Sequence, residues 1–187
     1  LKEINESVES VRKTLRGRFE VGADGAPRFH LGAEVLDPAR VEGLRSGAVR
    51  RIIGIGQGTA AIAAEGIVFL LRRALAGARL PLETWATKAT ELSGHGLRDD
   101  MSDTLVVAVS QSGTTSDTNR TVDLLKDRGA WVIAIVNRRS SDLVYKSHGI
   151  LYTSDGRDIE MSVASTKAFY AQNVAGQISL TDIISNQ

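Results

Sequence analysis

Short apolar runs alternate with helical patterns along the chain from residue 49 onward. The runs that predict strands lie at residues 52–55, 82–85, 105–109, 132–136 and 150–152. Helical patterns lie between and after them, at residues 60–76, 89–97, 115–128, 141–146 and 165–184. The runs 105–109 and 132–136 are apolar throughout, which is typical of parallel strands covered on both faces. Strands alternating with helices predict an open α/β sheet, whose ligand lies beyond the carboxyl ends of the strands.

The start of the chain has a different pattern. Four apolar residues recur there at helical spacing: Ile4, Val8, Val11 and Leu15. This stripe predicts an amphipathic helix over residues 3–16, and the Gly- and Pro-rich stretch 19–32 is expected to be connective. An Asp-Pro pair predicts a short helix over residues 37–44. We therefore expect an N-terminal helix with a connecting segment at 1–48, followed by one α/β domain at 49–187.

Composition excludes several classes of protein. The 187 residues are 42% hydrophobic and 24% charged, as in an ordinary folded domain. Lys and Arg number 23 and Asp and Glu 22, so a net charge of +1 argues against nucleic acid as a partner. The sequence has no cysteine, which excludes disulfides and thiolate catalysis and fits the cytoplasm. No apolar run approaches the ~18 residues of a membrane span. The chain begins with Leu, so we expect it to be a piece of a longer protein.

A loop rich in hydroxyl groups follows the run 105–109. Residues 110–118 read SQSGTTSDT and hold six Ser and Thr side chains. Because the next helix begins at Thr115 or Ser116, its free amides and the positive end of its dipole face the same space as those hydroxyls. We expect a phosphate there. No Lys or Arg occurs from residue 110 to 119, so this is not a Walker P-loop. The alternative is that the hydroxyls only cap the helix.

A second loop, residues 56–61, reads GQGTAA and matches the G-x-G-x-x-A dinucleotide fingerprint. That fingerprint also requires an acidic residue at the end of the next strand, and the nearest candidate, Glu83, stands at the start of its run. A dinucleotide module therefore stays a minor alternative, as does a purely structural role for the glycines in helix packing. A third segment begins the last helix with Ser162 or Ser165 as its cap. Its cation, Lys167, is expected to be solvated or paired with a carboxylate such as Glu160.

These residues resemble the sugar isomerase (SIS) domain, and more closely the first isomerase subdomain of the glutamine:fructose-6-phosphate aminotransferase family. Three stretches carry the resemblance: residues 110–118 are similar to the family's SQSGET-x-DT phosphate loop, residues 163–172 to its VASTKAF-x-x-Q segment, and residues 2–18 to the helix that leads into its isomerase half. The resemblance runs from Leu1 to at least Gln172.

The resemblance implies a three-layer αβα sandwich around a five-stranded parallel sheet, with fructose 6-phosphate or glucosamine 6-phosphate as the ligand. It implies these binding residues: Ser110, Gln111, Ser112 and Thr115 for the phosphate, Gly58 and Thr59 in the neighbouring loop, and Val163 and Ser165 along the sugar. The chain departs from the family at Gln57, where the family has Cys, and at Ala60, where the family has a phosphate-binding Ser. The second change removes a hydrogen bond to a charged group, worth about 1.5–3 kcal/mol.

The resemblance assigns the acid–base residues of the reaction to a second isomerase subdomain and a partner subunit. We therefore expect no catalytic residue, metal or cofactor within this chain, and a homodimer and a second SIS subdomain as its partners. His30, His95 and His148 are scattered singly and are expected to be surface or packing residues. Two alternatives remain open, a phosphosugar-sensing regulator and a related deglycase. A full-length sequence would decide, because a glutaminase half that begins with Cys upstream would indicate the aminotransferase and a helix-turn-helix module would indicate the regulator.

Overall fold

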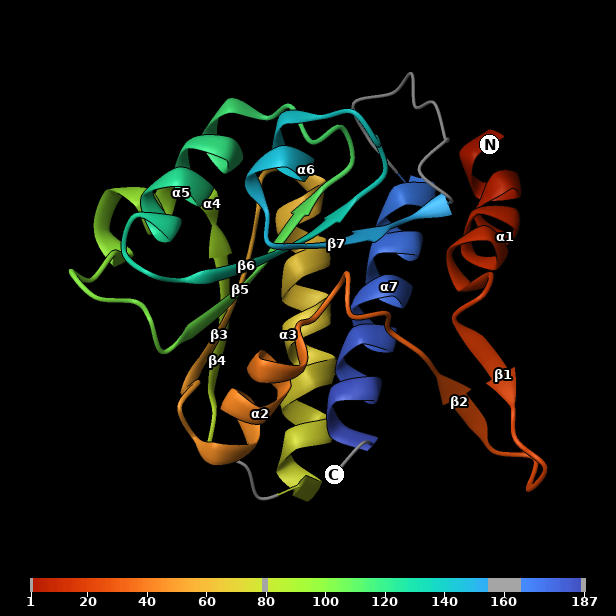
Figure 1. The fold of residues 1–187 in the computed structure, drawn as a ribbon. Helices are drawn as coiled ribbons and strands as arrows, with labels where there is room; N and C mark the ends of the chain where they lie inside the picture. Colours follow the sequence, from red (N-terminus) through yellow and green to blue (C-terminus); the bar gives the residue numbers. More distant parts are fainter. Residues whose placement is uncertain (1, 79–80, 155–165, 186–187) are drawn as a thin grey trace.

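A five-stranded parallel sheet forms the centre of the molecule (Figure 1). The structure is a computed structural model that describes residues 2–78, 81–154 and 166–185. Its strands, in the spatial order β4-β3-β5-β6-β7, are β3 (Arg51–Gly56), β4 (Glu83–Lys88), β5 (Thr104–Ser110), β6 (Trp131–Val136) and β7 (Gly149–Tyr152). All seven residues of β5 are buried, as are all but the first of β3 and of β6. The predicted parallel sheet is confirmed, and its central strands are those with continuous apolar runs.

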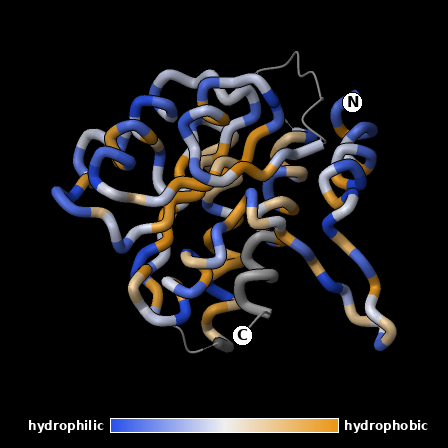
Figure 2. Tube along the Cα trace, in the orientation of Figure 1, coloured by the Kyte–Doolittle hydropathy of each residue, from blue (hydrophilic) through white to orange (hydrophobic). Residues whose placement is uncertain are grey.

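Helices cover both faces of the sheet (Figure 1). One face carries α2 (Pro38–Ser46), α3 (Thr59–Ala78) and α7 (Thr166–Ser185), and the other carries α4 (Ala89–Glu91), a π-helical turn (Leu92–Gly96), α5 (Ser116–Lys126) and α6 (Asp142–Lys146). Side chains alternate between the faces along each strand, so Val107 packs against α3 and α7 while its neighbour Val106 packs against α5. The strands are correspondingly the most hydrophobic part of the trace in Figure 2.

The strand order reverses between β3 and β5. The chain leaves β3 through α3 and returns as β4 on one side, and it leaves β5 through α5 and returns as β6 on the other. The carboxyl ends of β3 and β5 therefore lie side by side while the helices that follow them go to opposite faces. In open α/β sheets this switch point is where ligands bind.

The N-terminal helix α1 (Lys2–Leu15) packs against α7 with a polar face rather than with its apolar stripe. Ile4 and Val8 are 62% and 59% exposed, whereas Ser10 and Thr14 are buried. The hydroxyls of Ser10 and Ser154 are hydrogen-bonded, and Thr14 Oγ1 accepts the amide of Ser154 at 2.9 Å. The predicted helix is confirmed, and hydrogen bonds to Ser154, just after β7, turn its polar face toward the body.

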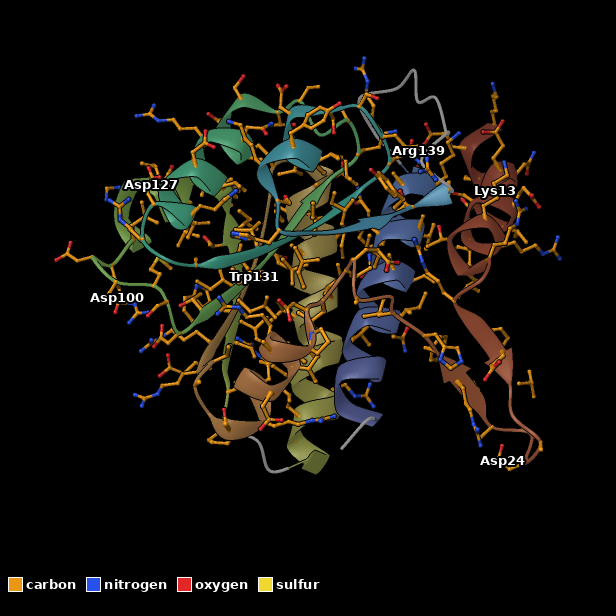
Figure 3. All side chains as sticks on the ribbon, viewed as in Figure 1. Lys13, Asp24, Asp100, Asp127, Trp131 and Arg139 are labelled. Atoms are coloured by element: carbon orange, nitrogen blue, oxygen red, sulfur yellow. The ribbon has the colours of Figure 1, made fainter. Side chains whose placement is uncertain are left out.

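A β-hairpin follows α1, where the sequence predicted only a connection. Its strands β1 (Phe19–Val21) and β2 (Pro27–Phe29) pair antiparallel, and the rings of Phe19 and Phe29 lie 5.5 Å apart. The hairpin projects from the sheet, with Asp24 at its tip (Figure 3). The sequence did not predict this hairpin because its strands are three residues long and almost wholly exposed, so they carry no alternating pattern.

The short helix α2 begins as predicted. The Asp37 side chain accepts the amide of Ala39 at 2.8 Å and Pro38 occupies the first turn. The edge strand β4, in contrast, is shifted from the predicted 82–85 to Glu83–Lys88. None of its residues is fully buried, so their polar and apolar positions mark the strand only weakly.

Candidate functional site

A cavity of about 340 Å³ opens at the carboxyl ends of β3 and β5, at the switch point of the sheet. Three segments line it: Gln57, Gly58, Thr59 and Ala60 after β3; Val109, Ser110, Gln111, Ser112, Thr115 and Thr118 at the end of β5 and the start of α5; and Gln172 on α7. Six of the eight binding residues predicted from the sequence therefore face one space. The other two, Val163 and Ser165, lie outside the described residues.

The loop between β5 and α5 is held rigidly in place. Gly113 has a φ of +65°, and its carbonyl accepts the amide of Leu143 and the side-chain amide of Asn119, each at 3.0 Å. Asn119 also donates to the carbonyl of Thr115 at 3.0 Å, and the Gln111 carbonyl accepts the amide of Asn137 at 3.2 Å. These bonds occupy the carbonyls of Gln111, Gly113 and Thr115 and so fix the path of the loop backbone.

The hydroxyls of this loop are not all used by the helix that follows. Thr115 is the N-cap of α5, yet its side chain makes no capping hydrogen bond. Ser110 Oγ accepts the amide of Gly113 at 3.0 Å, and Ser112 Oγ accepts the amide of Thr114 at 3.3 Å. A hydroxyl that accepts a bond still has its own proton to donate. Because the cavity lies in front of these groups, helix capping alone does not account for them.

The glycines after β3 have two separate roles. A Cβ on Gly56 would lie 2.6 Å from the backbone of Ala60, so this glycine lets α3 start close against the strand. Gly58 has a φ of +58° and would carry a Cβ into open space, so it serves the turn itself. The structural role in helix packing, considered in the sequence analysis, is therefore present at Gly56. At Gly58 the loop conformation brings the backbone to the cavity.

The acidic residue that a dinucleotide site requires is remote from the cavity. Glu83 begins β4, at the amino edge of the sheet, and its carboxylate accepts Arg51 Nε at 2.9 Å. β4 ends instead at Lys88. The fingerprint at residues 56–61 thus lacks its ribose-binding partner at the end of the second strand.

The electrostatics of the cavity come from neutral groups. None of the described residues that line it carries a charge. The amino ends of α3 and α5 point toward it, and each contributes the positive end of a helix dipole. Lys167 is only 6% exposed, and its Nζ donates to Glu6 of α1 at 2.8 Å. The expectation that Lys167 pairs with a carboxylate is confirmed, with Glu6 as the partner seen.

Five cavity residues were not among the predicted binding residues: the apolar Ala60 and Val109, and the polar Gln57, Thr118 and Gln172. Thr118 lies one helical turn beyond Thr115, so helical spacing was the signal that could have indicated it. Gln57 stands inside the glycine loop, and Gln172 comes from α7, which only the tertiary fold brings to this edge. The buried atoms Thr118 Oγ1 and Gln57 Oε1 have no hydrogen-bond partner among the described residues.

Other chemistry is not seen in the described part of the chain. Residues 2–78, 81–154 and 166–185 contain no group of three or more His, Asp or Glu placed to hold a metal ion. No helix within these ranges is both long enough and apolar enough to cross a bilayer. His148 lies at the opposite sheet edge from the cavity, where its Nδ1 accepts the amide of Val132 at 3.0 Å.

Comparison with known proteins agrees with this geometry. The SIS domain family model matches residues 48–181. Glutamine–fructose-6-phosphate aminotransferase (isomerizing) of Corynebacterium diphtheriae is 38% identical over 179 residues, which are 93% of this chain and 25% of that protein. The chain thus spans about a quarter of the length of such relatives.

Solved structures show the same fold. The C-terminal domain of glucosamine-fructose-6-phosphate aminotransferase from Francisella tularensis superposes with a TM-score of 0.76 at 26% identity, over 98% of this chain and 46% of that one. The Vibrio vulnificus NanR protein complexed with ManNAc-6P shares the fold alone, with a TM-score of 0.68 at 17% identity over 99% of this chain and 60% of that one. The family model covers most of the chain and the strand order fits it, so the chain belongs to the SIS domain family.

Proposed function

We propose that this chain binds the phosphate end of a hexose phosphate, fructose 6-phosphate or glucosamine 6-phosphate, as the first isomerase subdomain of a glutamine:fructose-6-phosphate aminotransferase. One observation carries the proposal: a neutral cavity, lined by hydroxyls, lies between two helix N-termini at the switch point of the sheet. The names of the similar proteins supply the ligand class.

In this proposal the β5–α5 loop holds the phosphate. Ser110, Ser112 and Thr115 donate hydroxyl protons to its oxygens, and the first-turn amides of α5 add further donors, with Gln111 beside them. Gly58 and Thr59 complete the site from the β3–α3 side. Val163 and Ser165, which the resemblance assigns to the sugar, remain part of the proposal without a described position.

The chain is proposed to bind and not to catalyse. Isomerisation of a sugar phosphate needs a general base positioned at the carbons between which the proton moves. Among the described residues the cavity is lined by neutral side chains, and Gln57, Gln111 and Gln172 do not ionise. The base is proposed to come from a second SIS subdomain in the remaining length of the full protein, and a homodimer in the cytoplasm is the proposed assembly. Conversion of fructose 6-phosphate to its aldose isomer at an enzyme-like rate by this chain alone would contradict this.

Titration calorimetry tests the binding proposal. The chain is expected to bind fructose 6-phosphate or glucosamine 6-phosphate and to give no heat with NAD. Ser112→Ala removes one hydrogen bond to a charged group, so affinity should fall about 10- to 150-fold. Ser46→Ala, an exposed serine at the far end of the sheet, is the control and should bind as the parent does. Equal affinity of Ser112→Ala and Ser46→Ala would show that this loop does not bind the phosphate.

A further inference from the structure

Two polar atoms at the cavity are buried without partners. Thr118 is 1% exposed, and its Oγ1 has no hydrogen-bond partner among the described residues. The same holds for Oε1 of Gln57. Both side chains line the cavity, from opposite sides: Thr118 from the first turn of α5, and Gln57 from the loop after β3. Buried polar atoms usually have a hydrogen-bond partner, so two such atoms without partners at one cavity indicate groups that bind a ligand.

A second threonine on the same helix shows what a structural hydroxyl looks like. Thr121 is fully buried, and its Oγ1 lies 2.9 Å from the carbonyl of Ala89 and 2.7 Å from that of Asp117. Threonine inside a helix commonly bonds the carbonyl four residues before it, and Thr121 does so. Thr118 lies three residues earlier in the same helix, and its Oγ1 has no hydrogen-bond partner among the described residues. Its hydroxyl is therefore available on the cavity side.

We propose that Thr118 and Gln57 are further ligand-contacting residues that make the cavity selective for a phosphate ester carrying hydroxyl or amino groups over phosphate alone. The proposal rests on the phosphate site described above. Thr118 lies one turn beyond Thr115, so its hydroxyl donates to the anionic end of the ligand. Gln57 lies across the cavity from Thr118 and binds the remainder of the ligand.

The chemistry of the two atoms requires a ligand with both kinds of group. The dianionic phosphate group of an ester offers acceptors only, so it satisfies the hydroxyl of Thr118 and leaves the carbonyl oxygen of Gln57 unpaired. A carbonyl oxygen accepts only, and its partner has to be an O–H or N–H of the ligand. A polyhydroxy or amino sugar phosphate supplies both partners at once. Thr118 also adds a hydroxyl to a site in which Ala60 offers none.

Two isosteric substitutions test the assignment, with fructose 6-phosphate and inorganic phosphate as probes. Thr118→Val should weaken binding of both probes about tenfold or more, because both present the anion. Gln57→Met should weaken the binding of fructose 6-phosphate several-fold, which is roughly the loss of one neutral hydrogen bond, and leave the binding of inorganic phosphate unchanged. The inference would be overturned if neither variant lost affinity, or if Gln57→Met lost affinity for both probes equally. If the parent chain binds no sugar phosphate, the proposed function fails instead.

Thermal unfolding of the ligand-free chain gives an independent readout. Thr118→Val removes an unpaired buried hydroxyl, so its melting temperature should stay the same or rise, whereas Thr121→Val, the matched control, should melt lower and keep its ligand affinity. The opposite ranking would make Thr118 a structural residue. If Thr118→Val does not fold, Thr118→Ser and Thr118→Ala replace it. Thr118→Ser should keep its affinity for both probes, and Thr118→Ala should lose it. Equal affinity of these two variants would overturn the assignment.

Discussion

At the scale of single residues, Gly113 fixes the shape of the hydroxyl loop. Its φ of +65° lies in the left-handed region, and a Cβ there would come within 2.6 Å of Cβ of Ser141, a buried residue. Its carbonyl is held by Leu143 and Asn119. Glycine is therefore required for both conformation and space, and the direction of the hydroxyls follows from it.

Gly113→Ala should lower both stability and affinity. The left-handed conformation alone costs about 1–2 kcal/mol for a residue with a Cβ, and the contact with Ser141 adds to that. Gly25→Ala is the control, because Gly25 has a φ of +77° but open space around it, in the hairpin far from the cavity. Urea unfolding should rank Gly113→Ala below Gly25→Ala, and only the former should lose sugar phosphate affinity. Equal unfolding free energies would contradict the steric part of the argument.

His148 makes stability depend on pH at the other edge of the sheet. Burial, aided by the positive charges of Lys126 and Arg40, lowers the pKa of His148 below its ordinary value of 6.5. Its ring stacks on Trp131, labelled in Figure 3, with centroids 4.2 Å apart. Its Nδ1 accepts the amide of Val132, which a protonated Nδ1 could not do.

Because the folded chain holds this proton less tightly than the unfolded chain, stability is complete above pH 6.5 and falls as the pH drops below that value. Thermal unfolding between pH 7.5 and 5.5 should show a decline in melting temperature for the parent chain. In His148→Asn, whose side-chain oxygen can still accept the Val132 amide, the decline should be smaller. Parallel declines in the two proteins would assign the pH dependence to other groups.

At the scale of elements, α1 is joined to the start of α7 and to the end of β7. Glu3 accepts the amide of Thr166 at 2.7 Å, and Glu6 pairs with the buried Lys167. Arg18, just beyond α1, donates to the carbonyl of Tyr152. The N-terminal helix thus caps α7, the helix that delivers Gln172 to the cavity.

Glu6→Gln should destabilise the chain by about 1–3 kcal/mol. The figure lies between that of a surface pair and that of a buried one, since Lys167 is buried while the Glu6 side chain is 39% exposed. Lys2→Ala is the control: Lys2 also pairs with Glu6, but at 3.8 Å and with an 85% exposed side chain, so its loss should change almost nothing. Chemical denaturation measures both variants, and equal effects would mean that burial of Lys167 does not strengthen its pair.

The elements differ in how well their sequence specifies them. β5 and β6 were predicted to within one residue because buried central strands are apolar without interruption. The edge strand β4 and the exposed hairpin lack that pattern, so one was shifted and the other missed. The apolar stripe of α1 predicted a helix correctly but not its orientation, because hydrogen bonds of Ser10 and Thr14 decide which face meets the body.

The candidate site was predictable to the extent that its chemistry is local in sequence. Density of hydroxyls identified the loop at residues 110–118, and glycines identified the loop at 56–61. Gln172 could not be placed this way, because α7 begins some fifty residues after the β5–α5 loop and more than a hundred after the β3–α3 loop, and reaches them only through helix packing. The missing partners of Thr118 and Gln57 are likewise properties of the folded chain, since no pattern of residues shows which polar atoms stay unpaired.

At the scale of the whole molecule, the cavity joins the two halves of the sheet. β3 with α3 supplies one wall, β5 with α5 the other, and α7 closes the side where both meet. The net charge of the chain is only +1, and the described cavity residues are neutral. Recognition of an anion then depends on short-range hydrogen bonds and helix dipoles rather than on long-range attraction, so affinity should vary little with salt.

The most direct measurement is a crystal structure of the chain with glucosamine 6-phosphate. The phosphate is predicted to lie within hydrogen-bond distance, about 2.7–3.2 Å, of the Ser112 and Thr115 hydroxyls and of the first-turn amides of α5, with the sugar directed toward Gln57. A sugar phosphate bound elsewhere on the chain, or a cavity without it at saturating concentration, would contradict the prediction.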